Sequence, residues 1–185
     1  MERNTLAMVH AFLREYVKPG ALCIDATAGL GRDTALLCRL AGPEGRVLAF
    51  DIQQSALDQT AALLAAEGHQ AELHLDSHVN MADYAAAGSV DCVVFNFGRL
   101  PGGAPAIMTR SDSSVAAVEV ALGLLKPGGV MALALYYGGA NGYEERDALL
   151  DCLRGIDERT YSVLRCDWLG RPNDPPIAVF IWREN

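Results

Sequence analysis

The feature that most constrains the fold is a regular alternation of short apolar runs with helical segments. Five such runs end in a polar residue or a turn, and they cover residues 21–25, 46–51, 71–75, 90–96 and 130–137. Helical spacing predicts helices over about 5–17, 33–40, 54–66, 111–125 and 142–154, with a short helix after residue 77 and a cap at Gln54 or Ser55. Strands that alternate with helices indicate a doubly wound, mostly parallel sheet.

The C-terminal part of the chain follows a different pattern. Two strand-like runs, TYSVLRCDWL and PIAVFIWR, are separated by GRPNDP, which is typical of a hairpin. The sequence therefore predicts an α/β fold with a seven-stranded sheet that ends in an antiparallel hairpin. By analogy of fold, this is the Rossmann-like layout of class I S-adenosylmethionine methyltransferases.

Length and composition narrow the class of protein. A chain of 185 residues, 51% of them hydrophobic, is expected to form a single domain over 1–185, with an N-terminal helix within 1–20. The net charge is 15 − 23 = −8, which argues against a protein that coats nucleic acid through bulk charge, although a local basic rim stays open. Five scattered cysteines, no signal peptide and no long apolar run favour a soluble cytoplasmic protein.

A glycine turn and an acidic residue point to a nucleoside ligand. In doubly wound sheets, ligands bind outside the carboxyl ends of the strands. Gly29 and Gly31 follow the first run and let the backbone approach a ligand closely, but Thr34 replaces the third glycine of a dinucleotide fingerprint. Asp51, about 20 residues further on, is placed to accept both hydroxyl protons of a ribose. Two structural alternatives stay open: the glycine segment is only a tight turn, and Asp51 only caps a helix.

Polar residues after the third and fourth runs extend this candidate site. Ser77 and His78 are placed to bracket an adenine ring, although His78 could instead cap or pack. The side-chain carbonyl of Asn96 can accept an N–H bond from an amine and so orient its lone pair, which favours N-methylation; a turn role for Asn96 carries equal weight. The segment Gly98 to Arg110 is predicted to be a lid or a substrate loop. The other histidines lack the spacing of metal ligands, so no metal is expected.

These motifs together resemble a small bacterial methyltransferase family, long labelled rRNA methylases, whose members methylate the aminomethyl group of 5-aminomethyl-2-thiouridine at the tRNA wobble position. The resemblance rests on DATAGLGRDT, FDIQ, Ser77-His78, FNFGRLPGG, Thr109, LLKPGG, YYGGANGYEE, Asn173 and Pro175-Pro176. The chain departs from the family pattern at Leu30, Arg32, Arg99, Ala104-Pro105 and Gly139.

The resemblance implies S-adenosylmethionine as cofactor and tRNA as a transient substrate, and completes the list of candidate residues. The cofactor set is Asp25, Thr27, Gly29, Leu30, Gly31, Asp51, Gln53, Ser77 and His78, and the substrate set is Arg99, Leu100, Pro101 and Thr109. The catalytic set is Asn96, with Asp33 and Tyr136 near strand ends as candidate general bases. Arg32, Arg99, Arg110 and Arg171 map to loops and are candidates for a phosphate-binding rim, with solvated loop arginines as the alternative.

Three other functions are compatible with parts of the pattern. A methyltransferase of a small amine metabolite would share every cofactor motif, a nicotinamide oxidoreductase is disfavoured by Thr34, and a nucleoside-binding module without catalysis would bind the cofactor but not consume it. The sequence leaves the oligomeric state open, a homodimer included.

Overall fold

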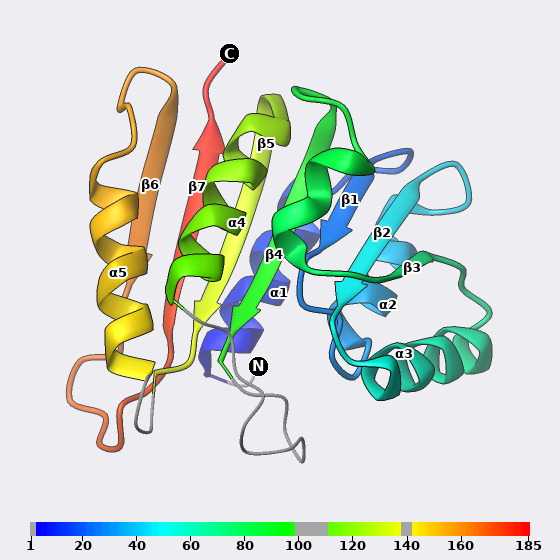
Figure 1. Ribbon diagram of the computed structural model, residues 1–185, viewed down its shortest axis with the longest axis horizontal. Coiled ribbons are helices and arrows are strands. Elements are labelled where there is room, and N and C mark those ends of the chain that lie inside the picture. The colour runs from blue at the N-terminus through cyan, green and yellow to red at the C-terminus, as the bar shows by residue number, and fades with distance from the viewer. Residues whose placement is uncertain (1–2, 99–110, 138–141) are drawn as a thin grey trace.

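The computed structural model describes residues 3–98, 111–137 and 142–185, and these form a seven-stranded sheet with helices on both faces (Figure 1). The strands are β1 (Leu22–Asp25), β2 (Arg46–Asp51), β3 (Glu72–Leu75), β4 (Val90–Phe97), β5 (Leu125–Leu135), β6 (Tyr161–Cys166) and β7 (Ile177–Arg183). The helices are α1 (Thr5–Tyr16), α2 (Arg32–Ala41), α3 (Gln54–Glu67), α4 (Ser111–Leu124) and α5 (Gly142–Arg154), with a 3₁₀ helix η1 (His78–Asp83).

The strand order is β3-β2-β1-β4-β5-β7-β6, and the strands from β1 to β5 pair in parallel. Only β7 runs the other way, antiparallel to both β5 and β6, as the predicted hairpin requires. The predicted fold class is thereby confirmed. We call the edge at which β1, β2, β4 and β5 end the carboxyl edge.

Alternation along the central strands separates two layers of core. In β4, Val93 and Phe95 face a layer that contains η1, α4 and α5, whereas Cys92 and Val94 face the layer of α1 and α2. In Figure 1, α1 lies behind β4 and β5. Because side chains alternate along a strand, Asn96 continues the set of Cys92 and Val94 and lies on the side of α1 and α2.

Some element boundaries differ from the sequence-based predictions. The fifth strand begins at Leu125 and ends at Leu135, so Tyr136 and Tyr137 follow it instead of closing it. The cap of α3 is Gln53, one residue before the earlier of the two predicted positions. Boundaries move in this way because long-range pairing, and not local propensity, decides where a strand begins.

The central strands bury two cysteines. Cys23 and Cys92 are fully buried and lie side by side on β1 and β4, where they belong to the packed core. Within the described ranges, no helix is both long enough and apolar enough to cross a bilayer.

Candidate functional site

The glycine turn after β1 begins the candidate site at the carboxyl edge. Gly31 has a φ of 77°, and a Cβ there would lie 2.8 Å from the Cα of Thr60 in α3. The Ala28 N–H donates to the Phe50 carbonyl oxygen at 2.9 Å, and the Thr60 hydroxyl donates to the Gly29 carbonyl oxygen at 3.3 Å. A side chain would not fit at residue 31, so glycine allows the turn to pack against α3.

Asp51 joins this turn to the end of β2. One carboxylate oxygen accepts the Gly29 N–H at 3.0 Å, and the other accepts the Gln53 N–H at 2.9 Å. A carboxylate has about four lone-pair sites, so about two remain for a ligand at this half-buried position. The carboxylate is therefore held in place and can still accept a pair of hydroxyl groups.

Asp25 has a different position, because 0% of it is exposed. Its oxygens accept hydrogen bonds from the Thr34 hydroxyl at 2.6 Å and from the Thr27 N–H at 3.1 Å. Burial, and next the charge of Asp33, raise the pKa of Asp25 to about 7. Asp25 thus holds the turn and the start of α2 from beneath.

Thr27 links the ends of β1 and β4. Its hydroxyl oxygen accepts the backbone N–H of Asn96 at 2.7 Å. This bond ties the glycine turn directly to the residue predicted to bind an amine, so the two predicted parts of the site lie together.

Asn96, Asp33 and His10 form a hydrogen-bonded chain across three elements. The Asn96 side-chain amide donates from Nδ2 to one oxygen of Asp33, and Nε2 of His10 lies 2.5 Å from the other oxygen. Asp33 is 5% exposed. A carboxylate only accepts hydrogen bonds, so the amide must turn its NH₂ group to Asp33 and leave its Oδ1 atom available.

His10 is the residue that the sequence analysis missed. The sequence predicts only that His10 lacks the spacing of a metal ligand. Its partner Asp33 is 23 residues away and on another helix, so sequence spacing does not link the two residues. One signal was present. His10 precedes the buried Leu13 by three residues, so it lies beside the buried stripe of α1, where a polar side chain needs a partner.

Tyr136 lies directly after β5 and beside the end of β4. Its N–H donates to the Phe97 carbonyl oxygen at 3.0 Å, and a Cβ on Gly98 would lie 2.9 Å from the Tyr136 Cβ. The residue is 41% exposed. Burial of part of the ring, and then the charge of Asp33, raise the pKa of Tyr136, which keeps its hydroxyl protonated at neutral pH.

Ser77 and His78 complete the edge after β3. The Ser77 hydroxyl oxygen accepts the Val79 N–H at 3.4 Å and caps η1. The Nε2 atom of His78 is buried and has no hydrogen-bond partner in the part of the chain that the structure describes. Burial lowers the pKa of His78, although the nearby Ala26 backbone and the charge of Asp51 oppose this, so the ring is neutral at pH 7.

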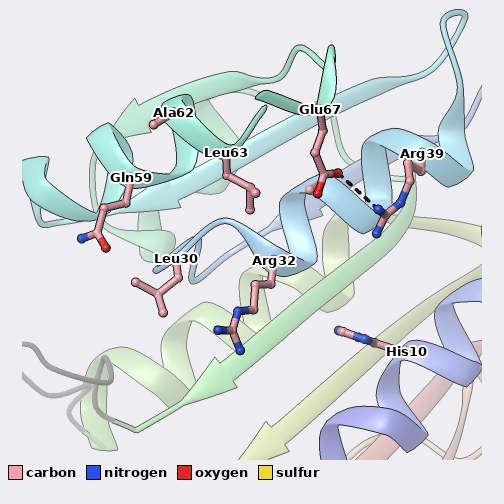
Figure 2. A pocket seen from close by; sticks show the side chains of 9 residues that line it. His10, Leu30, Arg32, Arg39, Gln59, Ala62, Leu63 and Glu67 are labelled. Atoms are coloured by element: carbon pink, nitrogen blue, oxygen red, sulfur yellow. Dashed lines mark hydrogen bonds and ion pairs between the residues drawn. The ribbon is translucent and has the colours of Figure 1, made fainter. Parts of the chain in front are cut away.

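The remaining predicted residues lie beside or outside this arrangement. Leu30 and Arg32 line an open groove with His10, Gln59 and Leu63, between α1, α2 and α3, as Figure 2 shows. Asp51, Asn96 and His78 do not line that groove. The predicted substrate residues Arg99, Leu100, Pro101 and Thr109 lie outside the described residues, as do Arg110 and Gly139.

The described residues contain no group of three or more His, Cys, Asp or Glu side chains arranged to hold a metal ion. The site is instead a set of hydrogen-bonding groups around a glycine turn.

Comparison with known proteins identifies the family. Residues 47–182 match the family described as "Putative rRNA methylase". The chain is 31% identical to the chloroplastic tRNA (mnm5s2U34)-methyltransferase of Arabidopsis thaliana, over 99% of this chain and 71% of that protein.

Solved structures agree with this match. A "putative rRNA-methylase" of Clostridium thermocellum has a TM-score of 0.95 and 38% identity, and covers 99% of both chains. A "putative methyltransferase" of Streptococcus mutans in complex with SAH has a TM-score of 0.90 and 31% identity, again over 99% of both chains. The chain therefore belongs to this rRNA-methylase family and is a methyltransferase with the class I fold, as its motifs predicted.

Proposed function

We propose that the protein transfers the methyl group of S-adenosylmethionine to the aminomethyl nitrogen of 5-aminomethyl-2-thiouridine at the wobble position of tRNA. The S-adenosylmethionine-dependent class rests on family membership and on the SAH-bound relative. The tRNA substrate draws support from the plant relative, which is named for the same wobble position. The observation that carries the nitrogen acceptor is the fixed orientation of the Asn96 amide.

The described residues fit the cofactor. Gly31 provides a turn that no side chain could form against Thr60, and Asp51 has lone pairs left for two ribose hydroxyls. Among the described residues the buried Nε2 atom of His78 has no hydrogen-bond partner, and a nucleobase would supply one. Leu30 and Gln53 lie on the same turn and strand end, so we assign these five residues to cofactor binding and Asp25, Thr27, Gly29 and Ser77 to positioning them. S-adenosylmethionine, when bound, supplies a methyl group on a positively charged sulfonium that leaves as a neutral thioether.

The role of Asn96 follows from its hydrogen bonds. Its Nδ2 atom is committed to Asp33, so its Oδ1 atom is the group that can accept an N–H of the substrate amine. An amine held in this way directs its lone pair to one side. Because orientation supplies much of the rate of a displacement at carbon, a fixed acceptor at this position aids the transfer. The amine attacks in its neutral form, and the methylated ammonium then loses a proton to water.

Asp33 and Tyr136 have supporting roles in this proposal. Both oxygens of Asp33 are already hydrogen-bonded, to Asn96 and to His10, so we assign Asp33 to holding the amide instead of removing a proton. Tyr136 keeps its hydroxyl proton because its pKa is raised, and so it is suited to donate a hydrogen bond at the mouth of the site.

The test is a single reaction with a defined product. The purified protein is incubated with S-adenosylmethionine and tRNA from cells that lack the enzyme, and the digested tRNA is analysed by mass spectrometry. We expect 5-methylaminomethyl-2-thiouridine to appear as its aminomethyl precursor disappears. A protein that binds SAH in calorimetry but methylates no tRNA would show that the acceptor is a different amine.

Two variants show whether the product depends on the proposed site. Asn96→Ala removes the amine acceptor and should abolish most of the product while SAH still binds. Asn185→Ala is the matched control, because Asn185 follows β7 at the opposite edge of the sheet, and it should behave as the parent protein.

A further inference from the structure

The connection between β6 and β7, residues 167–176, lies at the same edge as the candidate site. Leu135 at the end of β5 pairs with Ile177, and Cys166 at the end of β6 pairs with Ala178. The connection therefore meets the carboxyl edge beside the N-terminus of α1, and Figure 1 shows it at the end of the sheet where β4 and β5 finish.

Within this connection, Arg171 is held on an aromatic ring. Its guanidinium carbon lies 3.8 Å from the ring centroid of Trp168. The indole N–H of Trp168 donates to the Thr5 hydroxyl at 2.9 Å, and that hydroxyl donates to the Pro176 carbonyl oxygen at 2.5 Å. Thr5 is 2% exposed. The ring is thus fixed to the start of α1, and the guanidinium stacked on it keeps its N–H edges for a ligand.

The connection is also fixed on its other side. The Tyr143 hydroxyl, at the start of α5, donates to Asp174. Asn173 and Asp174 adopt left-handed backbone conformations with φ of 63° and 48°. Asn and Asp tolerate this region better than other residues with a side chain, so the sequence suits this bend. Hydrogen bonds to α1 and to α5 therefore hold the connection that carries Arg171.

Arg171 forms no salt bridge in the part of the chain that the structure describes. Among the described residues no carboxylate pairs with Arg171 or with the exposed Arg32, whereas Arg39 and Arg46 pair with Glu67 and Glu72. What distinguishes Arg171 is the stacked ring and its position beside the site.

Arg32 and Arg171 lie on opposite sides of the reacting position. Arg32 follows β1 and Arg171 follows β6, and these strands are four positions apart in the sheet order. At about 4.8 Å per strand, this corresponds to about 19 Å. Asn96 on β4 and Tyr136 after β5 lie between the two arginines. A small amine cannot touch both arginines, whereas an RNA chain that crosses the site can.

We propose that Arg171, stacked on Trp168, and Arg32 form a basic rim that binds backbone phosphates of RNA on the two sides of the nucleoside presented to Asn96. This inference rests on the proposed function and deepens it, because it names the surface that would hold the RNA. Phosphate contacts position a nucleic acid without reading its sequence, so the rim gives an acidic protein local affinity for RNA.

The test measures binding without catalysis. A fluorescently labelled anticodon stem-loop RNA is titrated with the protein at several salt concentrations, and anisotropy gives the Kd. Arg171→Ala should raise the Kd about threefold to tenfold and lower the slope of log Kd against log salt by about 0.7 to 1, the value for one lost phosphate contact. Arg154→Ala removes the same charge from an exposed arginine at the end of α5, on the opposite edge, and should match the parent protein.

A conservative variant separates charge from stacking. Arg171→Lys keeps the charge and loses the planar stack, so we expect a salt slope near that of the parent protein and a Kd between those of the parent and Arg171→Ala. Equal slopes for Arg171→Ala and Arg154→Ala would overturn the rim, even if tRNA is methylated. A reduced slope for Arg171→Ala, together with no methylation of any tRNA, would support the rim and refute the wobble-uridine substrate.

Discussion

Replacement of the buried Asp25 by asparagine should change how the stability of the protein depends on pH. In the folded protein the pKa of Asp25 is about 7, against an ordinary value of 3.8, chiefly because of burial and next because of Asp33. Between these two pH values the folded protein holds a proton that the unfolded chain releases. A rise in pH therefore lowers the free energy of unfolding, and this loss of stability is fully present above about pH 7.

The magnitude follows from the difference between the two pKa values. At about 1.4 kcal/mol per pKa unit, a carboxyl whose pKa rises from 3.8 to about 7 destabilises the folded state by about 4 kcal/mol at high pH. At about pH 4.5 the cost is about 1 kcal/mol, so about 3 kcal/mol of pH dependence arises between about pH 4.5 and pH 8. Asparagine has no charge to bury. It can accept the Thr27 N–H and donate to the Thr34 oxygen, so both hydrogen-bonded pairs can persist.

The measurement is urea unfolding at a series of pH values, followed by circular dichroism. The difference in unfolding free energy between Asp25→Asn and the parent protein should grow in favour of the variant by about 3 kcal/mol from about pH 4.5 to pH 8. Asp157→Asn is the control. The pKa of Asp157 is lowered, chiefly by the Thr160 hydroxyl, so its contribution to stability is lost as the pH falls and the variant should show the opposite trend. A difference for Asp25→Asn that does not vary with pH would refute the assignment of a buried, protonated carboxyl.

Three further predictions concern the site. Asn96→Ala should lower kcat by about 100-fold with little change in the Kd for SAH, because the amine loses its acceptor while the residues assigned to the cofactor stay in place; an unchanged kcat would remove Asn96 from the mechanism. Asp51→Ala should weaken SAH binding by about 10-fold to 100-fold, since a charged hydrogen-bond acceptor is lost, and equal calorimetric affinity would contradict this role. His10→Ala should lower kcat by about 10-fold without raising the KM for tRNA, because Asp33 loses one of its two partners. His10→Gln retains a donor and should recover part of the kcat, whereas a loss shared equally by both variants would indicate a role in folding alone.

Much of the fold was predictable because it depends on local patterns. The strands β1, β2 and β4 are short, mostly apolar runs with a polar residue at or near the end, and this pattern identifies a buried parallel strand from the sequence alone. The hairpin followed from the turn residues between two strand-like runs. Positions near Leu125 were harder to predict, because the start of β5 depends on its pairing with Val90, a residue far away in the chain.

The candidate site likewise contains residues that the sequence predicted and residues that it did not. The glycine turn, Asp51 and Asn96 were recognisable because each follows a predicted strand, and parallel strands bring their ends to one edge. The contact of His10 with Asp33 was not recognisable, since it depends on how α1 packs against α2 across the layer. The same holds for Arg171 and Trp168, whose position depends on a hydrogen bond to Thr5, 163 residues earlier in the chain.

The sequence by itself determined the class of fold, the edge predicted to bind a ligand and the kind of chemistry, because periodicity and strand-end residues act over a few positions. Only the tertiary structure decided which polar groups come into contact. It buries Asp25 under the glycine turn, and it places Asp33 within hydrogen-bond distance of both the Asn96 amide and His10. The physical reason is that hydrogen bonds act over about 3 Å, and groups distant in the chain come that close only when helices pack on the sheet.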